Sequence, residues 1–226
     1  MQKFIAALFL CICSIAGMGQ QSEVRSIGSF SGLKAGEAID VYLKKGDKES
    51  VRVETSGTAL GNVLTEISGS YLKIHMRDGR YKNQNVKVYV TYVSLDRIHA
   101  SSAANVYSEG TISSNSLTLS ASSAATIEIA INAGEVMVEV SSAGDIVLEG
   151  KAKSLELEVS SAGEVDAYEL ECEVVRAEAS SAGSAKISVT KELNARASSG
   201  GSIRYRGTPG RTNTDSSSGG SVKKSS

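Results

Sequence analysis

The sequence is poor in the residues on which most enzymes and metal sites depend. Its 226 residues include two histidines, one proline, three cysteines and no tryptophan. Neither His75 nor His99 begins a metal-ligand motif such as H-E-x-x-H, and the chain has no G-x-S-x-G nucleophile motif and no phosphate-binding G-x-x-x-x-G-K-[ST] loop. We therefore expect no catalytic residues, no cofactor and no enzymatic activity.

The N-terminus has the composition of an export signal. Lys3 supplies a short positive region, residues 4–15 form an apolar run too short to span a bilayer, and residues 16–19 (AGMG) offer small side chains for cleavage. We predict a signal peptide over residues 1–19, with cleavage after Gly19. A lipoprotein is the alternative, but Cys11 and Cys13 follow Leu10 and Ile12, where lipidation requires a small residue.

Export implies a location in the periplasm, at the outer membrane surface or outside the cell, with no transmembrane segment in the mature chain. Removal of the leader takes two cysteines away and leaves Cys172 alone, so no intramolecular disulfide can form. We interpret Cys172 as an ordinary strand residue, because no histidine accompanies it.

No excess of one charge points to a partner. The chain has 24 lysines and arginines against 25 aspartates and glutamates, a formal net charge of −1, which becomes −2 when Lys3 leaves with the leader. Nucleic-acid binding domains usually carry a strong basic excess. We therefore expect no nucleic-acid partner.

A four-residue signature, Ser-Ser-Ala/Gly-Ala/Gly, recurs along most of the chain. Its copies start at Ser101, Ser122, Ser141, Ser160, Ser180, Ser198 and Ser217. These starts are 21, 19, 19, 20, 18 and 19 residues apart. A fixed period near twenty with apolar alternation is typical of a stacked β-solenoid.

Apolar and polar residues alternate on both sides of each signature, which is the two-residue period of a β-strand. In the copy at Ser160 the apolar positions are Leu155, Leu157, Val159, Val165 and Ala167. Each repeat is expected to hold two short strands joined by a tight bend, with equivalent residues stacked about 4.8 Å apart in parallel ladders. We predict an all-β fold: a parallel β-helix-like solenoid with coils of about 19 residues and a less regular N-terminal β segment.

The fourth signature position is always Ala or Gly, as at Ala104 and Gly144. A small residue fits a corner where coils stack closely, and glycine would also supply a positive φ there. The paired serines are interpreted as small polar corner residues. The alternative is a flat hydroxyl array that matches a glycan or ice.

The predicted organisation has four parts: a signal peptide (1–19), an N-terminal β segment that caps the solenoid (20–98), the repeat solenoid (99–222) and a disordered tail (223–226). Within the cap, strand-like stretches occur at 38–43, 50–54, 71–76 and 86–93, and residues 60–64 are suited to one helical turn. The cap is rich in tyrosine. Its Tyr42, Tyr71, Tyr81, Tyr89 and Tyr92 are interpreted as half-buried strand residues, with a sugar-binding surface as the alternative.

One acidic column stands out two residues before the signature, at Glu139, Glu158 and Glu178. Stacked carboxylates repel one another unless they are screened or bridged by a cation. A solvated charged face is the preferred interpretation, and a ladder of divalent cations is the alternative.

The chain carries a repeated motif, Ser-x-Gly-x-Ile/Val, at residues 142–146 and 161–165. It also has a leader and the stretches 30–33 (FSGL) and 39–43 (IDVYL). In these features the chain resembles the head GIN domain family of putative auto-transporter adhesins (DUF2807). The resemblance covers nearly the whole exported chain. It implies a right-handed β-helix-like fold in exported bacterial proteins, commonly from the Bacteroidetes. The family provides no established catalytic residues.

Two functions are consistent with these features. The first is an exported, non-catalytic, adhesin-like protein of the periplasm or cell surface that presents solenoid faces, or its N-terminal end, to a glycan or protein. The second is a structural scaffold, a homo-oligomer that associates through the ends of the solenoid, where strand edges are unpaired.

Overall fold

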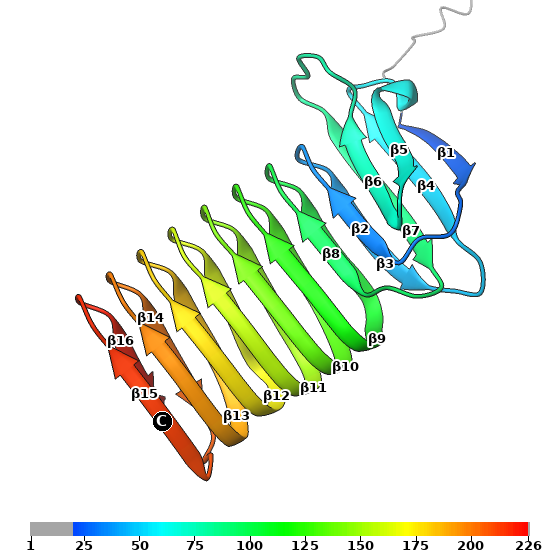
Figure 1. Ribbon diagram of the computed structural model, residues 1–226. Coiled ribbons are helices and arrows are strands. Elements are labelled where there is room, and N and C mark those ends of the chain that lie inside the picture. The colour runs from blue at the N-terminus through cyan, green and yellow to red at the C-terminus, as the bar shows by residue number, and fades with distance from the viewer. Residues whose placement is uncertain (1–19, 226) are drawn as a thin grey trace, which may run out of the picture.

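The computed structural model describes residues 20–225, which build an elongated β-solenoid with a less regular cap at its N-terminal end (Figure 1). The predicted fold class is confirmed. The described residues are nearly all β and form a solenoid of about seven turns of roughly 19 residues. The predicted signal peptide, with Cys11 and Cys13, and the final residue, 226, lie outside the described residues.

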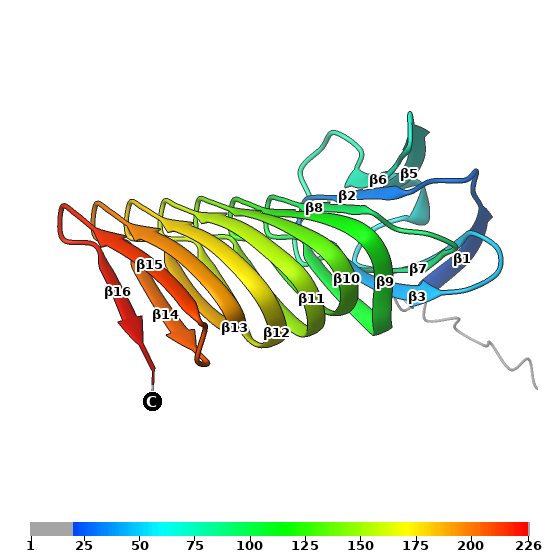
Figure 2. The same ribbon diagram turned by 60° about the horizontal axis from the view of Figure 1, so that its bottom comes forward.

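The regular part of the solenoid is a stack of parallel strands. These are β8 (Arg97–Ala100), β9 (Asn105–Ala121), β10 (Thr126–Val140), β11 (Asp145–Val159), β12 (Glu164–Ala179), β13 (Ser184–Ala197), β14 (Ser202–Arg206), β15 (Arg211–Ser216) and β16 (Ser221–Lys224). From β9 to β13 a single strand runs along both flat sides of its coil, through a gentle bend opposite the sharp corner (Figure 2). The sequence predicted two short strands per repeat because it gave no measure of how gentle this second bend is.

The apolar positions of successive repeats meet in register inside the solenoid. Val138 of β10 lies between Leu119 of β9 and Leu157 of β11, and all three are fully buried. The core is therefore a set of continuous apolar columns between the two flat sides. Burial of a Val or Leu side chain contributes roughly 1.5–3 kcal/mol, which explains why alternation alone predicted these columns.

Each signature forms a two-residue β-turn at the sharp corner of its coil. In the copy at Ser141, the N–H of Gly144 donates to the carbonyl of Ser141 at 2.9 Å, while Ser142 and Ala143 have φ values of 51° and 58°. Two consecutive left-handed residues define a type I′ turn. The expectation that the fourth position supplies the positive φ is therefore wrong, because the second and third positions supply it. The corner is held by the next coil, where the carbonyl of Ser161 accepts from the N–H of Ala143 at 3.1 Å.

The fourth position needs a small residue because of close packing alone. A Cβ atom built on Gly144 would lie 2.6 Å from the carbonyl oxygen of Ala121 in the preceding coil. Ala104 and Ala125 occupy the same position in the first two signatures and are fully buried. The predicted preference for Ala or Gly at the fourth position is confirmed, and its cause is close packing against the preceding coil.

The N-terminal part adds seven strands and one short 3₁₀ turn. These are β1 (Gln21–Ser26), β2 (Gly32–Ala35), β3 (Asp40–Lys45), β4 (Ser50–Ser56), η1 (Leu60–Asn62), β5 (Val63–Ser68), β6 (Tyr71–Met76) and β7 (Asn85–Tyr92). The four predicted strand stretches correspond to β3, β4, β6 and β7. The predicted helical turn is η1, and it gives way at once to β5, which the sequence did not predict.

The coils of this part do not stack in chain order. β2 pairs in parallel with both β6 and β8, and β3 pairs in parallel with both β7 and β9. The coil made by β6 and β7 therefore lies outside the earlier β2–β3 coil. Antiparallel strands complete the end, with β5 on β6, β4 on β7 and β1 on β4.

The C-terminal end has no such cover. β15 pairs with β13 and β16 pairs with β14, both in parallel, and every residue of β15 is exposed. The expected disordered tail at 223–226 is corrected in part. Lys223 and Lys224 belong to β16, and the N–H of Ser225 donates to the carbonyl of Tyr205 at 2.8 Å.

Candidate binding groove at the junction of cap and solenoid

A groove with a volume of about 420 Å³ lies where the cap meets the solenoid. It is lined by Lys34, Ala35, Gly36, Glu37, Glu66, Lys73, Ile74, His75, Ser101 and Ser102. These residues come from β2, β5, β6 and the corners that follow β2 and β8. Pockets that bind small ligands have volumes of roughly 300–1,000 Å³ and a few convergent polar groups. The groove meets both criteria.

Two lysines share one wall of this groove. Lys34 of β2 and Lys73 of β6 are direct neighbours in the parallel ladder. Within residues 20–225 neither lysine has an ion-pair partner. The Nζ atom of Lys34 lies 4.5 Å from the centre of the Tyr71 ring. Two adjacent ammonium groups repel each other, so this wall favours an anionic group that would lie between them.

Carboxylates and an imidazole also line the groove, and Glu66 of β5 is the direct neighbour of Lys73 in the antiparallel β5–β6 ladder. His75 Nε2 is 3.5 Å from a carboxylate oxygen of Glu66, and a carboxylate oxygen of Glu37 accepts a hydrogen bond from the backbone N–H of Met76. Glu37 has a φ of 63°. It takes the corner position that serine holds in the later repeats, because Ala35 is in register with Ala100 and Asp40 with Asn105. A left-handed Glu is uncommon, and here the conformation places its carboxylate at the groove.

An aromatic and cationic cluster lies beside the groove. The guanidinium carbon of Arg97 lies 5.1 Å from the centre of the Tyr71 ring, and the Tyr71 hydroxyl is 3.4 Å from His99 Nε2. Desolvation, followed by the charge of Lys34, lowers the pKa of His99. His99 is therefore neutral at pH 7, and it can exchange a hydrogen bond with the Tyr71 hydroxyl.

Gly32 makes the position of Tyr71 possible. A Cβ atom at Gly32 would lie 2.5 Å from Cδ1 of Tyr71. The bare glycine thus lets the ring lie against β2, where Lys34 and Arg97 flank it. The resulting surface combines an aromatic ring with cationic hydrogen-bond donors.

The sequence singled out Tyr71 and both histidines but missed the groove. Lys34 and Lys73 are far apart in the chain and meet only because the β6–β7 coil lies outside the β2–β3 coil. The available signal was the similar pattern of residues 32–35 (GLKA) and 71–74 (YLKI), which would place the two lysines in one column.

The acidic column lies in register as the sequence required. Glu139 of β10, Glu158 of β11 and Glu178 of β12 are direct neighbours in the ladder, and the next residue in the column is Arg196. Arg176 lies 3.0 Å from Glu178 and supplies a positive charge at one end. Within the described residues no three acidic, histidine or cysteine side chains are grouped as metal ligands. The solvated charged face stays a prediction, with the ladder of divalent cations as its alternative.

A second tyrosine cluster lies on the opposite flat side. The ring of Tyr42 stacks on Tyr89 at 5.1 Å and on Tyr107 at 5.4 Å, and the Arg52 guanidinium lies 3.9 Å from the centre of the Tyr89 ring. Because these rings cover one another, they offer mainly edges and hydroxyls to a ligand. Tyr92 is 3% exposed and is a core residue, in agreement with the packing interpretation for that position.

Cys172 lies in a core column between Ala152 and Val189 and is 1% exposed. Burial, with a contribution from Glu171, raises the pKa of its thiol to about 12. A thiol with this pKa is not a nucleophile near pH 7. The interpretation of Cys172 as a packing residue is confirmed.

The family model of the putative auto-transporter adhesins, head GIN domain, matches residues 29–209, and the chain belongs to this family. No curated protein sequence matches the chain. Within residues 20–225 no helix is long and apolar enough to cross a bilayer.

Several crystal structures share the fold. A putative adhesin from Bacteroides fragilis NCTC 9343 superposes with a TM-score of 0.84 at 18% identity, over 92% of this chain and 98% of that one. A putative adhesin from Parabacteroides merdae ATCC 43184 gives 0.73 at 16% identity, over 92% and 96%. A putative lipid binding protein from Parabacteroides distasonis ATCC 8503 gives 0.68 at 16% identity, over 92% and 97%.

Proposed function

We propose that this protein is an exported, non-catalytic, adhesin-like binding protein whose groove at the junction of cap and solenoid holds an acidic glycan. The observation that carries the proposal is the pair Lys34 and Lys73, adjacent and without ion-pair partners in the described chain, beside the Tyr71 ring. A sugar carboxylate would lie between the two ammonium groups. The family and the leader support the adhesin-like role and export.

Six groove residues and the neighbouring His99 have a place in this binding mode. Lys34 and Lys73 donate charge-assisted hydrogen bonds, which are the strong ones. Glu37, Glu66 and the corner serines Ser101 and Ser102 accept from or donate to sugar hydroxyls. His99, neutral at pH 7, keeps the Tyr71 ring in place. None of these contacts requires bond breaking.

The test is a screen of the mature chain on an array of acidic and neutral glycans, followed by calorimetry with the best ligand. Lys34→Ala and Lys73→Ala should each weaken binding about tenfold or more, because a hydrogen bond to a charged group contributes roughly 1.5–3 kcal/mol. Lys48→Ala, an exposed lysine in the cap outside the groove, is the matched control and should bind like the parent. Equal binding by the parent and both groove variants would reject the proposal.

One observation favours the scaffold alternative, namely the uncovered strands at the C-terminal end. Charge opposes end-to-end growth, because residues 20–98 have 12 basic and nine acidic residues, while residues 180–226 have eight basic and two acidic residues. Both ends are therefore net positive. Sedimentation velocity over a range of concentrations separates the two functions, since a scaffold grows into long assemblies and a binding protein stops at a defined size.

A further inference from the structure

Acidic and basic residues are concentrated in different coils of the solenoid, although the net charge of the whole chain is close to zero. Residues 99–179 contain 14 acidic and three basic residues, a net charge of −11, whereas residues 180–226 have a net charge of +6. The change of sign falls between β12 and β13. One molecule therefore carries two adjoining bands of opposite charge.

The sorting is sharpest in one outward-facing column on the flat side that also carries Tyr107. We name it the charge column. In ladder order it consists of Glu128 (β10), Val147 (β11), Asp166 (β12), Lys186 (β13), Arg204 (β14) and Lys223 (β16). The neighbouring column reads Thr126, Asp145, Glu164, Ser184, Ser202 and Ser221 on the same strands. Acidic residues lie on one side of the β12–β13 boundary, and basic residues and serines lie on the other.

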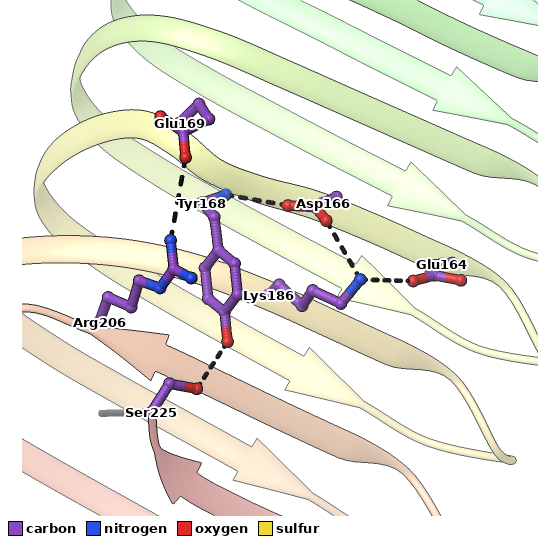
Figure 3. A network of polar contacts seen from close by, with 7 residues as sticks. All are labelled: Glu164, Asp166, Tyr168, Glu169, Lys186, Arg206 and Ser225. Atoms are coloured by element: carbon purple, nitrogen blue, oxygen red, sulfur yellow. Dashed lines mark hydrogen bonds and ion pairs between the residues drawn. The ribbon is translucent and has the colours of Figure 1, made fainter.

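Only the centre of the charge column is neutralised within the molecule. Lys186 Nζ lies 3.0 Å from a carboxylate oxygen of Glu164 and 3.1 Å from one of Asp166 (Figure 3). Within residues 20–225 the outer members Glu128, Arg204 and Lys223 have no ion-pair partner, and all three are exposed. The unsatisfied charges are thus acidic at one end of the column and basic at the other.

Such a column complements itself when it is reversed. A two-fold axis that lies parallel to the strands, at the β12–β13 boundary, stacks two flat sides face to face and reverses the order of the coils. β12 of one copy then lies opposite β13 of the other, β11 opposite β14, and β10 opposite β16. Glu128 meets Lys223, Asp166 meets Lys186, and Asp145 comes near Arg204, each twice because of the symmetry.

We propose that this flat side of β10–β14 and β16 binds a second copy of the chain, in an antiparallel two-fold dimer held by the charge column. Two sheets that stack face to face lie about 10 Å apart, which is close enough for charged side chains from both sheets to meet. Burial and the neighbouring carboxylates Glu164 and Asp166 raise the pKa of Asp145, and the guanidinium of Arg204 from the second copy would stabilise the ionised form. The groove lies away from this surface, so the dimer would carry two grooves.

The test is the mass of the mature chain in solution, measured by sedimentation velocity at low and high salt. At low salt the parent should reach twice the mass of the chain, and salt should weaken the dimer because its contacts are ionic. Lys223→Glu should weaken dimerisation about tenfold or more, since it places two carboxylates opposite each other. Adding Glu128→Lys to Lys223→Glu exchanges the two charges and should restore the dimer.

Arg211→Glu is the control, because it makes the same change of charge in β15, outside the charge column, and should leave the dimer intact. Circular dichroism establishes that each variant is folded. The proposal is overturned if the parent stays monomeric at its highest soluble concentration, if it forms filaments, or if the charge exchange fails to restore a dimer lost in Lys223→Glu. A monomer whose basic coils bind heparin would also overturn it, in favour of a polyanionic partner.

Discussion

The two ends of the solenoid shield the apolar core from solvent in different ways. A single core column begins with Leu72 and Leu33 at the N-terminal end, continues through Ile98 and Leu157, and finishes at Thr214. Leu72 is fully buried because the antiparallel strand β5 completes its coil, whereas Thr214 is exposed. One end keeps the apolar column and covers it, and the other end stops the column with a polar residue.

The difference shows why the ends are not interchangeable. The C-terminal coil replaces the core residues of β13, Leu193, Ala195 and Ala197, with Thr212, Thr214 and Ser216. Its outer strands carry Arg211, Lys223 and Lys224, and charged side chains on an edge strand oppose pairing with another chain. Terminal repeats with a polar outer face are a common requirement of solenoids.

The largest effect should come from a charge in the shared column. Leu72→Asp and Leu157→Asp should unfold the protein, because each places an unpaired carboxylate among buried apolar side chains. Thr214→Asp, in the same column, should change stability by no more than about 0.5 kcal/mol, because this position is exposed. Thermal melts measured by circular dichroism would decide. A strong loss in Thr214→Asp would mean that the last coil is an apolar part of the core after all.

The next effect concerns the corners. Gly144→Val should destabilise the protein by more than about 1 kcal/mol, because its Cβ would collide with the backbone of the preceding coil. Gly200, near the C-terminal end, has a φ of 75° and open space around it. Gly200→Ala should therefore cost only the left-handed conformation, about 1–2 kcal/mol, and less than Gly144→Val, because alanine occupies this position in the earlier coils. Chemical denaturation of both variants measures their free energies of unfolding. Equal losses of stability would mean that the steric collision at Gly144 costs no more than a left-handed conformation.

At each end of the solenoid, one arginine side chain links neighbouring strands or loops. Arg25 of β1, whose side chain is 19% exposed, donates to the carbonyls of Val63 at 2.7 Å and Leu60 at 2.9 Å. Arg25→Ala should cost roughly 1–3 kcal/mol, since it removes charge-assisted hydrogen bonds to two part-buried backbone carbonyls. Arg25→Lys should recover part of this loss.

The C-terminal tie is more exposed. Arg206 stacks on Tyr168 at 3.9 Å and approaches Glu169 at 3.8 Å, while the Tyr168 hydroxyl is 2.6 Å from the Ser225 hydroxyl (Figure 3). Arg206→Ala should cost no more than about 1 kcal/mol, because exposed cation–π and ion pairs contribute little. Urea titrations of Arg25→Ala and Arg206→Ala compare the stability that each arginine contributes. A larger loss from Arg206→Ala would reverse the ranking of the two ends.

The sequence predicted the repeated part of this fold almost completely. Columns such as Leu119, Val138 and Leu157 follow from alternation, because a fixed repeat places equivalent residues in register. It did not predict the reversed order of the first two coils, since strand partners distant in the chain leave no local pattern. The left-handed Ser142 and Ala143 were missed for a different reason, because these residue types seldom adopt a positive φ and are held there by the neighbouring coils.

The smallest expected effect concerns the acidic coils, residues 99–179. It tests whether crowded carboxylates lower the stability of these coils, which the basic C-terminal coils would not show. Burial, followed by the charges of Glu164 and Asp166, raises the pKa of Asp145 above its usual value of 3.8. The folded state therefore binds this proton more tightly than the unfolded state, and stability is lost as pH rises from 3.8 to the raised pKa. Asp145→Asn removes the titrating group, so the variant should melt above the parent at pH 7, and the gap should narrow as pH falls through this window. Melts of both proteins at low concentration and several pH values measure the gap. A gap that is constant with pH would assign the effect to the amide itself, and a parent more stable than the variant at pH 7 would mean that the carboxylate has a favourable partner, such as Arg204 of a second copy.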